Sequence, residues 1–297
     1  MPVGSSFDFA LAANASRRAL LAASVSAAFS LGGAARAARR IRNGDSPLLY
    51  PLACSLDADG AIYVVDLLLP GVWKVVEGKA SPFYRAEKKF RAPLAHPRAV
   101  AAVAPDQVVV ADSAARDLFL VKAGEAPRPL VGGKLDVPAA LVVLDDAILV
   151  ADTQRNEVWR GGVGATWSKR ASVPAPRGLA VDAEKQVWVV SARDNGLYRI
   201  AASGGEPEKI AQGEPGAYWS AIAVGADGVA VVVDSYAKTL WRIESGKPVA
   251  WVKDPLFDHP VGILRQGDDF LVADSRAKSL FLVSAAGKAA PLPLSAE

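Results

Sequence analysis

The chain contains two histidines, and each stands directly before a proline. His96 precedes Pro97, and His259 precedes Pro260. Imidazoles titrate near neutral pH, so a pair of them could bind a metal ion or act as acid and base. A catalytic zinc usually takes three protein ligands, however, and only two histidines are present. The pattern therefore favours packing or capping, and we expect neither a bound metal nor a cofactor.

Two arginines follow prolines in a similar context. Arg98 comes after Pro97, and Arg177 comes after Pro176. Guanidinium groups that converge on a cavity would favour an anionic ligand such as a carboxylate, sulfate or phosphate. Further cations occur in later turns: Arg116, Arg155, Arg193, Lys238, Arg276 and Lys278. The simpler alternative, which the sequence alone favours, is that these charges only keep the surface turns soluble.

A polar residue closes a recurring apolar run, as in VVVAD and FLVAD. The six copies lie 39–46 residues apart, at Asp66, Asp112, Asp152, Ser191, Asp234 and Asp274. A ring of carboxylates would suit metal or acid–base chemistry. However, an acid directly after a strand also accepts hydrogen bonds from backbone N–H groups two or three residues on. Because the acid recurs in nearly every copy, we predict a structural task for it.

Other positions repeat with the same period. Seven residues after each closing residue stands an aromatic: Trp73, Phe119, Trp159, Tyr198, Trp241 and Phe281. A proline lies 14 or 15 residues before the closing polar residue in five of the copies. In the fifth copy Trp219 takes the place of this proline. Each copy reads as strand, tight turn, strand, turn, strand and a final strand.

The second strand of each copy is apolar along its whole length, which requires a sheet that is covered on both faces. Four antiparallel strands in each of six units predict an all-β fold, a six-bladed β-propeller of four-stranded antiparallel blades, over residues 49–297. An open solenoid is the competing architecture. It needs polar terminal repeats, whereas the terminal copies here are as apolar as the middle ones.

Propeller topology brings the residues around the repeat prolines and the turns after the repeat acids to one rim of the central channel. A ligand would meet the channel at this rim. The residues that we predict to bind it are His96, Arg98, Arg177, Trp219 and His259.

The repeat resembles the NHL-repeat propellers and the related gluconolactonase-type propellers. The closest copy pairs Pro260-Val261-Gly262-Ile263 with Val272-Ala273-Asp274-Ser275. The resemblance implies the six-bladed fold and allows several activities. Gluconolactonase-type enzymes hold a divalent ion through a glutamate of the first inner strand, but residues 52–56 contain no carboxylate. The histidine-rich metal centre of the lyase propellers is not reproduced either.

Our leading interpretation is therefore a binding module that takes an anionic small molecule or a protein partner at its basic rim. The alternative is a metal-assisted hydrolase or lyase that uses His96 and His259. The formal charge of +3 is small beside 34 basic and 31 acidic groups, so we expect no nucleic-acid partner.

The N-terminal residues differ from the rest. Arg17 and Arg18 precede an uncharged run over 19–35 that ends in small residues, so residues 1–37 resemble a twin-arginine export signal. An ordinary secretory signal or an uncleaved anchor are the alternatives. We expect a periplasmic or secreted bacterial protein, with no stable membrane insertion after signal removal. Residues 38–48 would form a linker or a closing strand.

Two further features concern the first copy. Cys54 is the one cysteine, which excludes an internal disulfide, and we expect its thiol to be buried in the core. Leu67, Leu68 and Leu69 stand where other copies have polar turns. They would form an exposed apolar patch unless residues 38–48 or a partner cover them.

Overall fold

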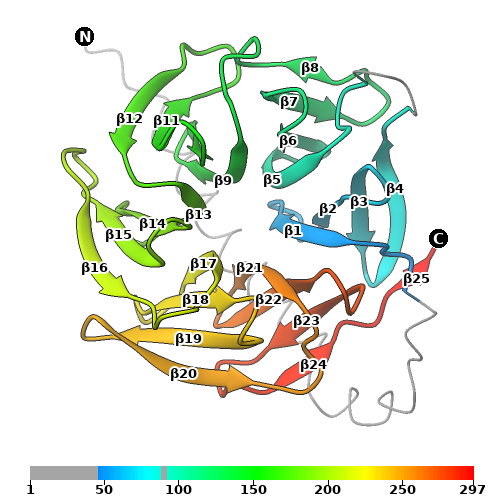
Figure 1. Cartoon of the computed structure of the whole chain (residues 1–297). Coiled ribbons are helices and arrows are strands. Elements are labelled where there is room, and N and C mark those ends of the chain that lie inside the picture. Colours follow the sequence, from blue (N-terminus) through cyan, green and yellow to red (C-terminus); the bar gives the residue numbers. More distant parts are fainter. Residues whose placement is uncertain (1–45, 88–91) are drawn as a thin grey trace, which may run out of the picture.

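The computed structural model describes residues 46–87 and 92–297, and Figure 1 shows them as six sheets arranged around a central axis. In this part of the chain there are strands and no helix. Every sheet has four antiparallel strands in sequence order, and one sheet gains a fifth strand. The prediction of a six-bladed propeller is thus confirmed. The export-signal prediction for residues 1–37, and most of residues 38–48, lie outside the described residues.

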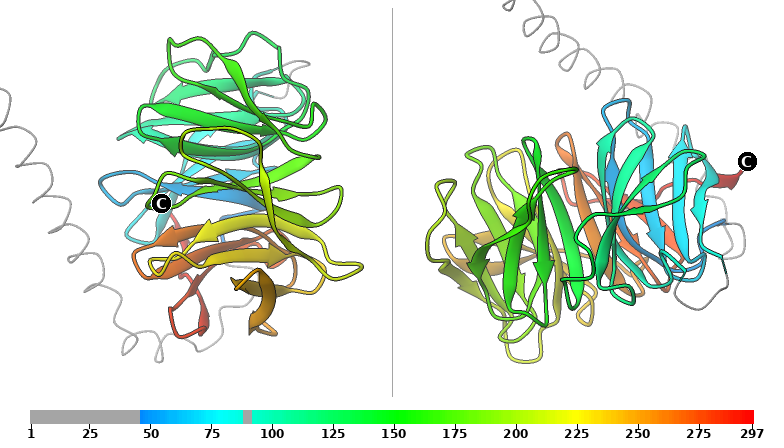
Figure 2. Two further views of the ribbon diagram at one scale, coloured as in Figure 1. Left: turned by 90° about the vertical axis from the view of Figure 1, so that its left-hand side faces the viewer. Right: turned by 90° about the horizontal axis from the view of Figure 1, so that it is seen from above.

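The strands follow the chain, four to a blade, from the axis outwards: β1 (Pro51–Leu56), β2 (Ile62–Asp66), β3 (Gly71–Val76), β4 (Lys79–Arg85), β5 (Pro97–Ala104), β6 (Gln107–Asp112), β7 (Asp117–Lys122), β8 (Arg128–Pro129), β9 (Pro138–Leu144), β10 (Ala147–Asp152), β11 (Glu157–Gly161), β12 (Ser168–Ser172), β13 (Pro176–Val181), β14 (Val187–Ser191), β15 (Gly196–Ile200), β16 (Glu208–Gln212), β17 (Trp219–Val224), β18 (Ala230–Asp234), β19 (Thr239–Glu244), β20 (Lys247–Lys253), β21 (Pro260–Gln266), β22 (Asp269–Asp274), β23 (Ser279–Val283), β24 (Ala289–Pro291) and β25 (Ser295–Ala296). The edge-on views in Figure 2 show a molecule that is broader than it is tall along the axis.

The second strand is the most buried strand of its blade, as its apolar run predicts, except in blade two, where β7 is as buried as β6. In β2, β10, β14 and β18 every residue is buried. The side chains on the two faces of each sheet belong to different apolar clusters, which lie between neighbouring blades. Since each buried Val or Leu contributes about 1.5–3 kcal/mol, these clusters supply most of the driving force for the radial arrangement.

The repeat acids perform the structural task that the sequence predicts. Asp274 is fully buried, and its Oδ1 accepts hydrogen bonds from the N–H groups of Arg276 and Ala277. The structure adds a second set of bonds. Asp274 also accepts from the N–H groups of Asp258 and His259, just before the repeat proline. The acid therefore ties the entry of the first strand to the turn that leads into the third.

The ring is fastened by the C-terminus. The inner strand β1 contacts β21, so blade one and blade six are neighbours. Beyond blade six the chain continues along the outer edge of blade one, where β25 pairs in parallel with β4. The side chains of Leu292 and Leu294 pack against the cluster between these blades. Residues 46–50 form no strand, so they do not complete the last blade.

The leucine turn of blade one is partly covered. Leu69 is buried in one cluster with Leu48, so the end of the segment 38–48 does shield it. Leu68 stays 60% exposed, and Leu67 lines the mouth of the channel. No helix in the described residues is long and apolar enough to cross a membrane.

Candidate ligand-binding site at the channel mouth

A β-bulge in each inner strand aims one side chain into the channel. The register of the inner strand shifts directly after the repeat proline, or after Trp219 in blade five. Bulges re-aim side chains in this way at the ends of sheets and next to binding sites. The six residues that follow the proline position all line one central cavity: Leu52, Arg98, Ala139, Arg177, Ser220 and Val261.

The cavity has a volume of about 430 Å³, which is a common size for a small-molecule site. Below the bulged residues lies a ring of small ones: Ala53, Ala99, Ala140, Gly178, Ala221 and Gly262. Neighbouring inner strands approach closely here, since a Cβ on Gly262 would lie 2.5 Å from the carbonyl oxygen of Leu52. A third ring is apolar: Cys54, Val100, Leu141, Leu179, Ile222 and Ile263. The cavity therefore has a polar mouth above an apolar shaft.

One side of the mouth is a stack of planar side chains. The guanidinium of Arg177 lies 4.3 Å from the centre of the Tyr218 ring, and Tyr236 stacks on Tyr218 at 4.5 Å. The His259 ring follows at 6.4 Å from Tyr236. Arg177 forms no hydrogen bond or ion pair within the described residues, and its Nη1 is buried without a partner. The stack fixes the plane of a cation whose N–H groups are unused.

Arg98 provides the second cation of the mouth. Its Nε donates to Ser113 Oγ at 3.2 Å, and Ser113 Oγ in turn donates to the carbonyl oxygen of His96. Arg98 forms no ion pair in the part of the chain described here. Its remaining N–H groups are therefore free for a ligand.

The mouth is basic because Arg98 and Arg177 line the cavity and, among the residues that the structure describes, no carboxylate does. The other predicted cations do not converge on it. Arg116 and Arg155 form ion pairs with Asp136, and Lys238 pairs with Asp258. None of the six turn cations lines the cavity, so the cations that line it among the described residues are Arg98 and Arg177.

The structure brings together Arg98, Arg177 and His259 among the five predicted site residues, since all three line the cavity. The other two, His96 and Trp219, do not line this cavity. His96 is exposed and lies outside the cavity lining. Trp219 is only 1% exposed and packs in the cluster between blades four and five. The reason is that Trp219 occupies the proline position, whose side chain points between the blades; the prolines there are buried as well.

The sequence interpretation missed the aromatic wall. Tyr218 directly precedes the proline position, like His259, and Tyr236 lies in the turn after a repeat acid. Both were on the predicted rim, but their stacking depends on the distance between two adjacent blades. The one available signal was a tyrosine at each of these two rim positions of the same blade.

Two residues that line the cavity, His259 and Cys54, have shifted pKa values. Loss of solvent, together with the charge of Arg276, lowers the pKa of His259, although Asp274 and Asp258 act in the opposite direction. His259 is therefore neutral at neutral pH. Loss of solvent raises the pKa of Cys54 to about 12. Its thiol therefore stays protonated. Cys54 packs against an apolar cluster, but it is half-buried and lines the shaft of the channel, so the expectation of a thiol buried in the core is wrong.

A metal centre formed by the two histidines has no structural counterpart in residues 46–87 and 92–297. Among these residues no three His, Cys, Asp or Glu side chains gather into a group that could hold a metal ion.

Comparisons with known proteins identify the fold. No family model matches the chain, and no curated protein matches it in sequence. Virginiamycin B lyase from Staphylococcus aureus superposes with a TM-score of 0.65 at 15% identity, over 83% of this chain and 85% of the lyase. A gluconolactonase from Xanthomonas campestris gives 0.66 at 16% identity, over 80% of this chain and 86% of the enzyme. The chain has the fold of the gluconolactonase-like six-bladed propellers.

A similar fold also occurs in a protein that is described as part of a protein–protein complex. A chain of a nidogen/laminin complex superposes with a TM-score of 0.63 at 13% identity, over 74% of this chain and 89% of that chain. At such identities the likeness establishes the fold alone, and it confirms the architecture that the repeat motif implied.

Proposed function

We propose that this protein is an exported binding module that holds a small anionic ligand at the channel mouth and performs no chemistry on it. The observation that carries the proposal is the pair Arg98 and Arg177. Both line a cavity without carboxylates, and neither has an anionic partner in the described residues.

The energetics support an anion at this place. The guanidinium of Arg177 is half-buried and makes no hydrogen bond to the described chain, so its N–H groups have lost water without a replacement acceptor, whereas Arg98 is exposed. A carboxylate or phosphate would accept the unused N–H groups, and bonds to charged groups contribute about 1.5–3 kcal/mol each. Because Arg177 is stacked on Tyr218, its donors are already oriented, so little side-chain entropy is lost on binding.

Calorimetric titration with paired probes tests the proposal. Phenyl phosphate and benzoate carry the charge, whereas phenol and benzamide are their neutral counterparts. We expect the anions to bind more tightly than the neutral probes, and Arg98→Ala and Arg177→Ala each to reduce anion affinity about tenfold or more. Arg193→Ala removes an exposed rim arginine outside the cavity, so it should leave affinity unchanged. If all three variants bound the anionic probes as tightly as the wild type does, the proposal that the two arginines of the mouth bind the anion would be wrong.

A metal-assisted hydrolase or lyase remains the second candidate. It is favoured only by the fold shared with proteins described as a gluconolactonase and a lyase. His259 lines the cavity but His96 does not, so the two imidazoles do not act on one ligand there. Metal analysis of protein purified without a histidine tag separates the candidates, because a stoichiometric transition metal would favour the enzyme.

Export and the nature of the partner belong to the same proposal. The twin-arginine pattern in residues 1–37 supports a periplasmic or secreted location. A protein could present the anion instead of a small molecule, as a carboxylate side chain or a C-terminal carboxylate. Fractionation of cells that express the full chain tests the location; recovery only in the cytoplasm would contradict it.

A further inference from the structure

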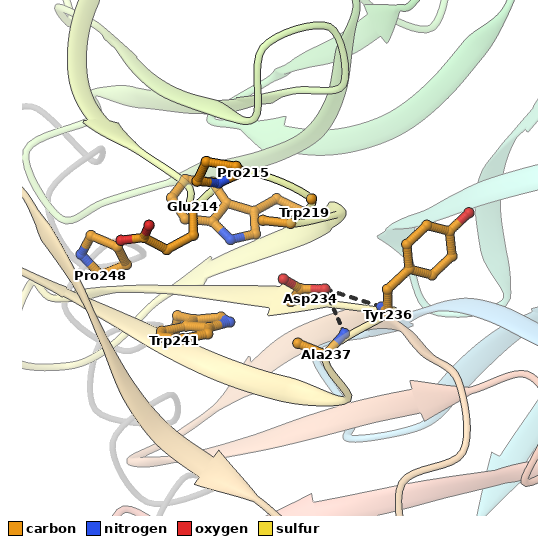
Figure 3. Close-up of a pocket in the computed structure, with 10 residues that line it drawn as sticks. Glu214, Pro215, Trp219, Asp234, Tyr236, Ala237, Trp241 and Pro248 are labelled. Carbon is orange, nitrogen blue, oxygen red and sulfur yellow. Dashed lines mark hydrogen bonds between the residues drawn. The ribbon is translucent and has the colours of Figure 1, made fainter.

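A second cavity, of about 350 Å³, lies between blades four and five, and it adjoins the channel mouth at Tyr236. Its lining comes from the segment before β17, the first residue of β17, the last residue of β18 and the turn after it, and strands β19 and β20: Glu214, Pro215, Gly216, Ala217, Trp219, Asp234, Tyr236, Ala237, Trp241 and Pro248. Figure 3 shows Trp219 and Trp241 on opposite sides of this space, with the carboxylates of Glu214 and Asp234 on the remaining two sides.

The cavity results from departures from the repeat in blade five. Trp219 stands where the other blades have proline, and its indole forms one wall. Trp241 is the repeat aromatic, and its partner in the neighbouring outer strand is Ala250. A methyl group at this place leaves the space beside the Trp241 ring open.

Blades three and four place a cation at the corresponding aromatic, whereas in blades one, two and six the residue opposite the aromatic is a proline. In blade four the repeat aromatic Tyr198 pairs with Lys209, whose Nζ lies 5.7 Å from the ring centre. In blade three Trp159 pairs with Lys169 and carries the guanidinium of Arg155 at 5.4 Å. A cation over an aromatic face is attracted by the ring quadrupole. Within the described residues, Trp241 has no lysine or arginine over it.

One oxygen of the repeat acid in blade five accepts no hydrogen bond from the described residues. In three blades the second oxygen of the repeat acid accepts an N–H from the entry segment, at Asp66, Asp152 and Asp274. Asp234 is only 1% exposed, and its Oδ1 accepts from Tyr236 and Ala237. Its Oδ2 accepts no hydrogen bond from the described chain. Asp112 Oδ2 is also unpaired, but it is fully enclosed, whereas Asp234 lines an open cavity.

The charge of the lining is negative. Glu214 and Asp234 contribute carboxylates, and no lysine or arginine of residues 46–87 or 92–297 lines the cavity. Two indoles on opposite sides of a cavity, with carboxylates beside them, resemble the aromatic cages that recognise quaternary ammonium groups. We propose that the cavity between blades four and five binds an alkylated ammonium ion, which takes the place that Lys209 fills in blade four.

Choline and its neutral counterpart 3,3-dimethylbutan-1-ol test this proposal, because they share one shape and differ in charge. Binding to the full-length protein can be followed by tryptophan fluorescence and by calorimetry. We expect choline to bind about tenfold more tightly than the alcohol. Equal affinity for the two probes, or no binding of choline, would overturn the proposal.

Variants locate the site. Ala250→Lys gives blade five the residue type of blades three and four, and it should abolish choline binding without harming the fold. Val249→Lys adds the same charge at the neighbouring exposed position and should change affinity little. Asp234→Asn should weaken choline binding about tenfold, whereas Asp112→Asn should not. Unchanged choline affinity in Ala250→Lys and Asp234→Asn would overturn the proposal even if choline binds elsewhere.

Discussion

The structural role of the repeat acids predicts very different costs for the same substitution in two blades. Asp274 accepts four backbone N–H groups, with Asp258 N at 2.8 Å from Oδ2. In Asp274→Asn the amide oxygen can replace Oδ1, but the amide nitrogen then faces the N–H of Asp258. The substitution loses a charge-assisted bond and leaves buried donors unpaired, which costs about 3–4 kcal/mol.

Asp112→Asn is the matched comparison. Asp112 is as buried as Asp274, but its Oδ1 accepts only from Ala114 and Ala115, and its Oδ2 has no partner. The amide nitrogen therefore replaces an atom that makes no bond, and the cost falls to about 1 kcal/mol. Urea unfolding followed by fluorescence gives both free energies of unfolding. If the two variants lost equal stability, the hydrogen bonds would not be the reason why the acid is repeated.

Three further predictions concern the ring, the histidine and the thiol. Deleting residues 292–297 removes two half-buried leucines and the hydrogen bonds that the N–H groups of Ser295 and Glu297 donate to blade one. The free energy of unfolding should therefore fall by about 3 kcal/mol and Tm by about 10 °C. An unchanged Tm would contradict closure by the C-terminus. The pKa of His259 is lower in the folded than in the unfolded protein, so its contribution to stability is complete above the unfolded pKa near 6.5 and is lost as the pH falls below that value. His259→Gln should therefore lose less stability than the wild type between pH 7 and 5. Parallel curves of unfolding free energy against pH for the two proteins would refute this. The Cys54 thiol, with its pKa raised to about 12, should react with iodoacetamide at pH 8 far more slowly than a free thiol does, and rapid labelling would show that solvent reaches it.

The architecture could be predicted from the sequence because every blade repeats the same local information. The apolar run of a second strand, such as residues 270–273, requires cover on both faces, and six such runs leave one arrangement that supplies it. The turn-forming role of Asp274 followed from its position after the strand. The hydrogen bonds that Asp274 accepts from Asp258 and His259 could not be predicted, because they depend on the path of the chain into the first strand of the blade.

The site was only half predictable, because it depends on side-chain directions that the repeat does not encode. A one-residue bulge decides that Arg177 faces the channel while the neighbouring proline position faces the space between blades. Trp219 was assigned to the rim for want of that information, and it lies instead in the wall of a different cavity. The way in which the ring closes could not be predicted either, because the two residues of β25 have no recognisable strand pattern.

The central claim is that an anion binds between Arg98 and Arg177 at the channel mouth. A crystal structure of the protein soaked with phenyl phosphate tests it most directly. The account predicts the phosphate within hydrogen-bond distance of both guanidinium groups, with its phenyl ring toward the apolar shaft. A phosphate bound elsewhere, or a mouth that stays free of the probe at saturating concentration, would contradict it.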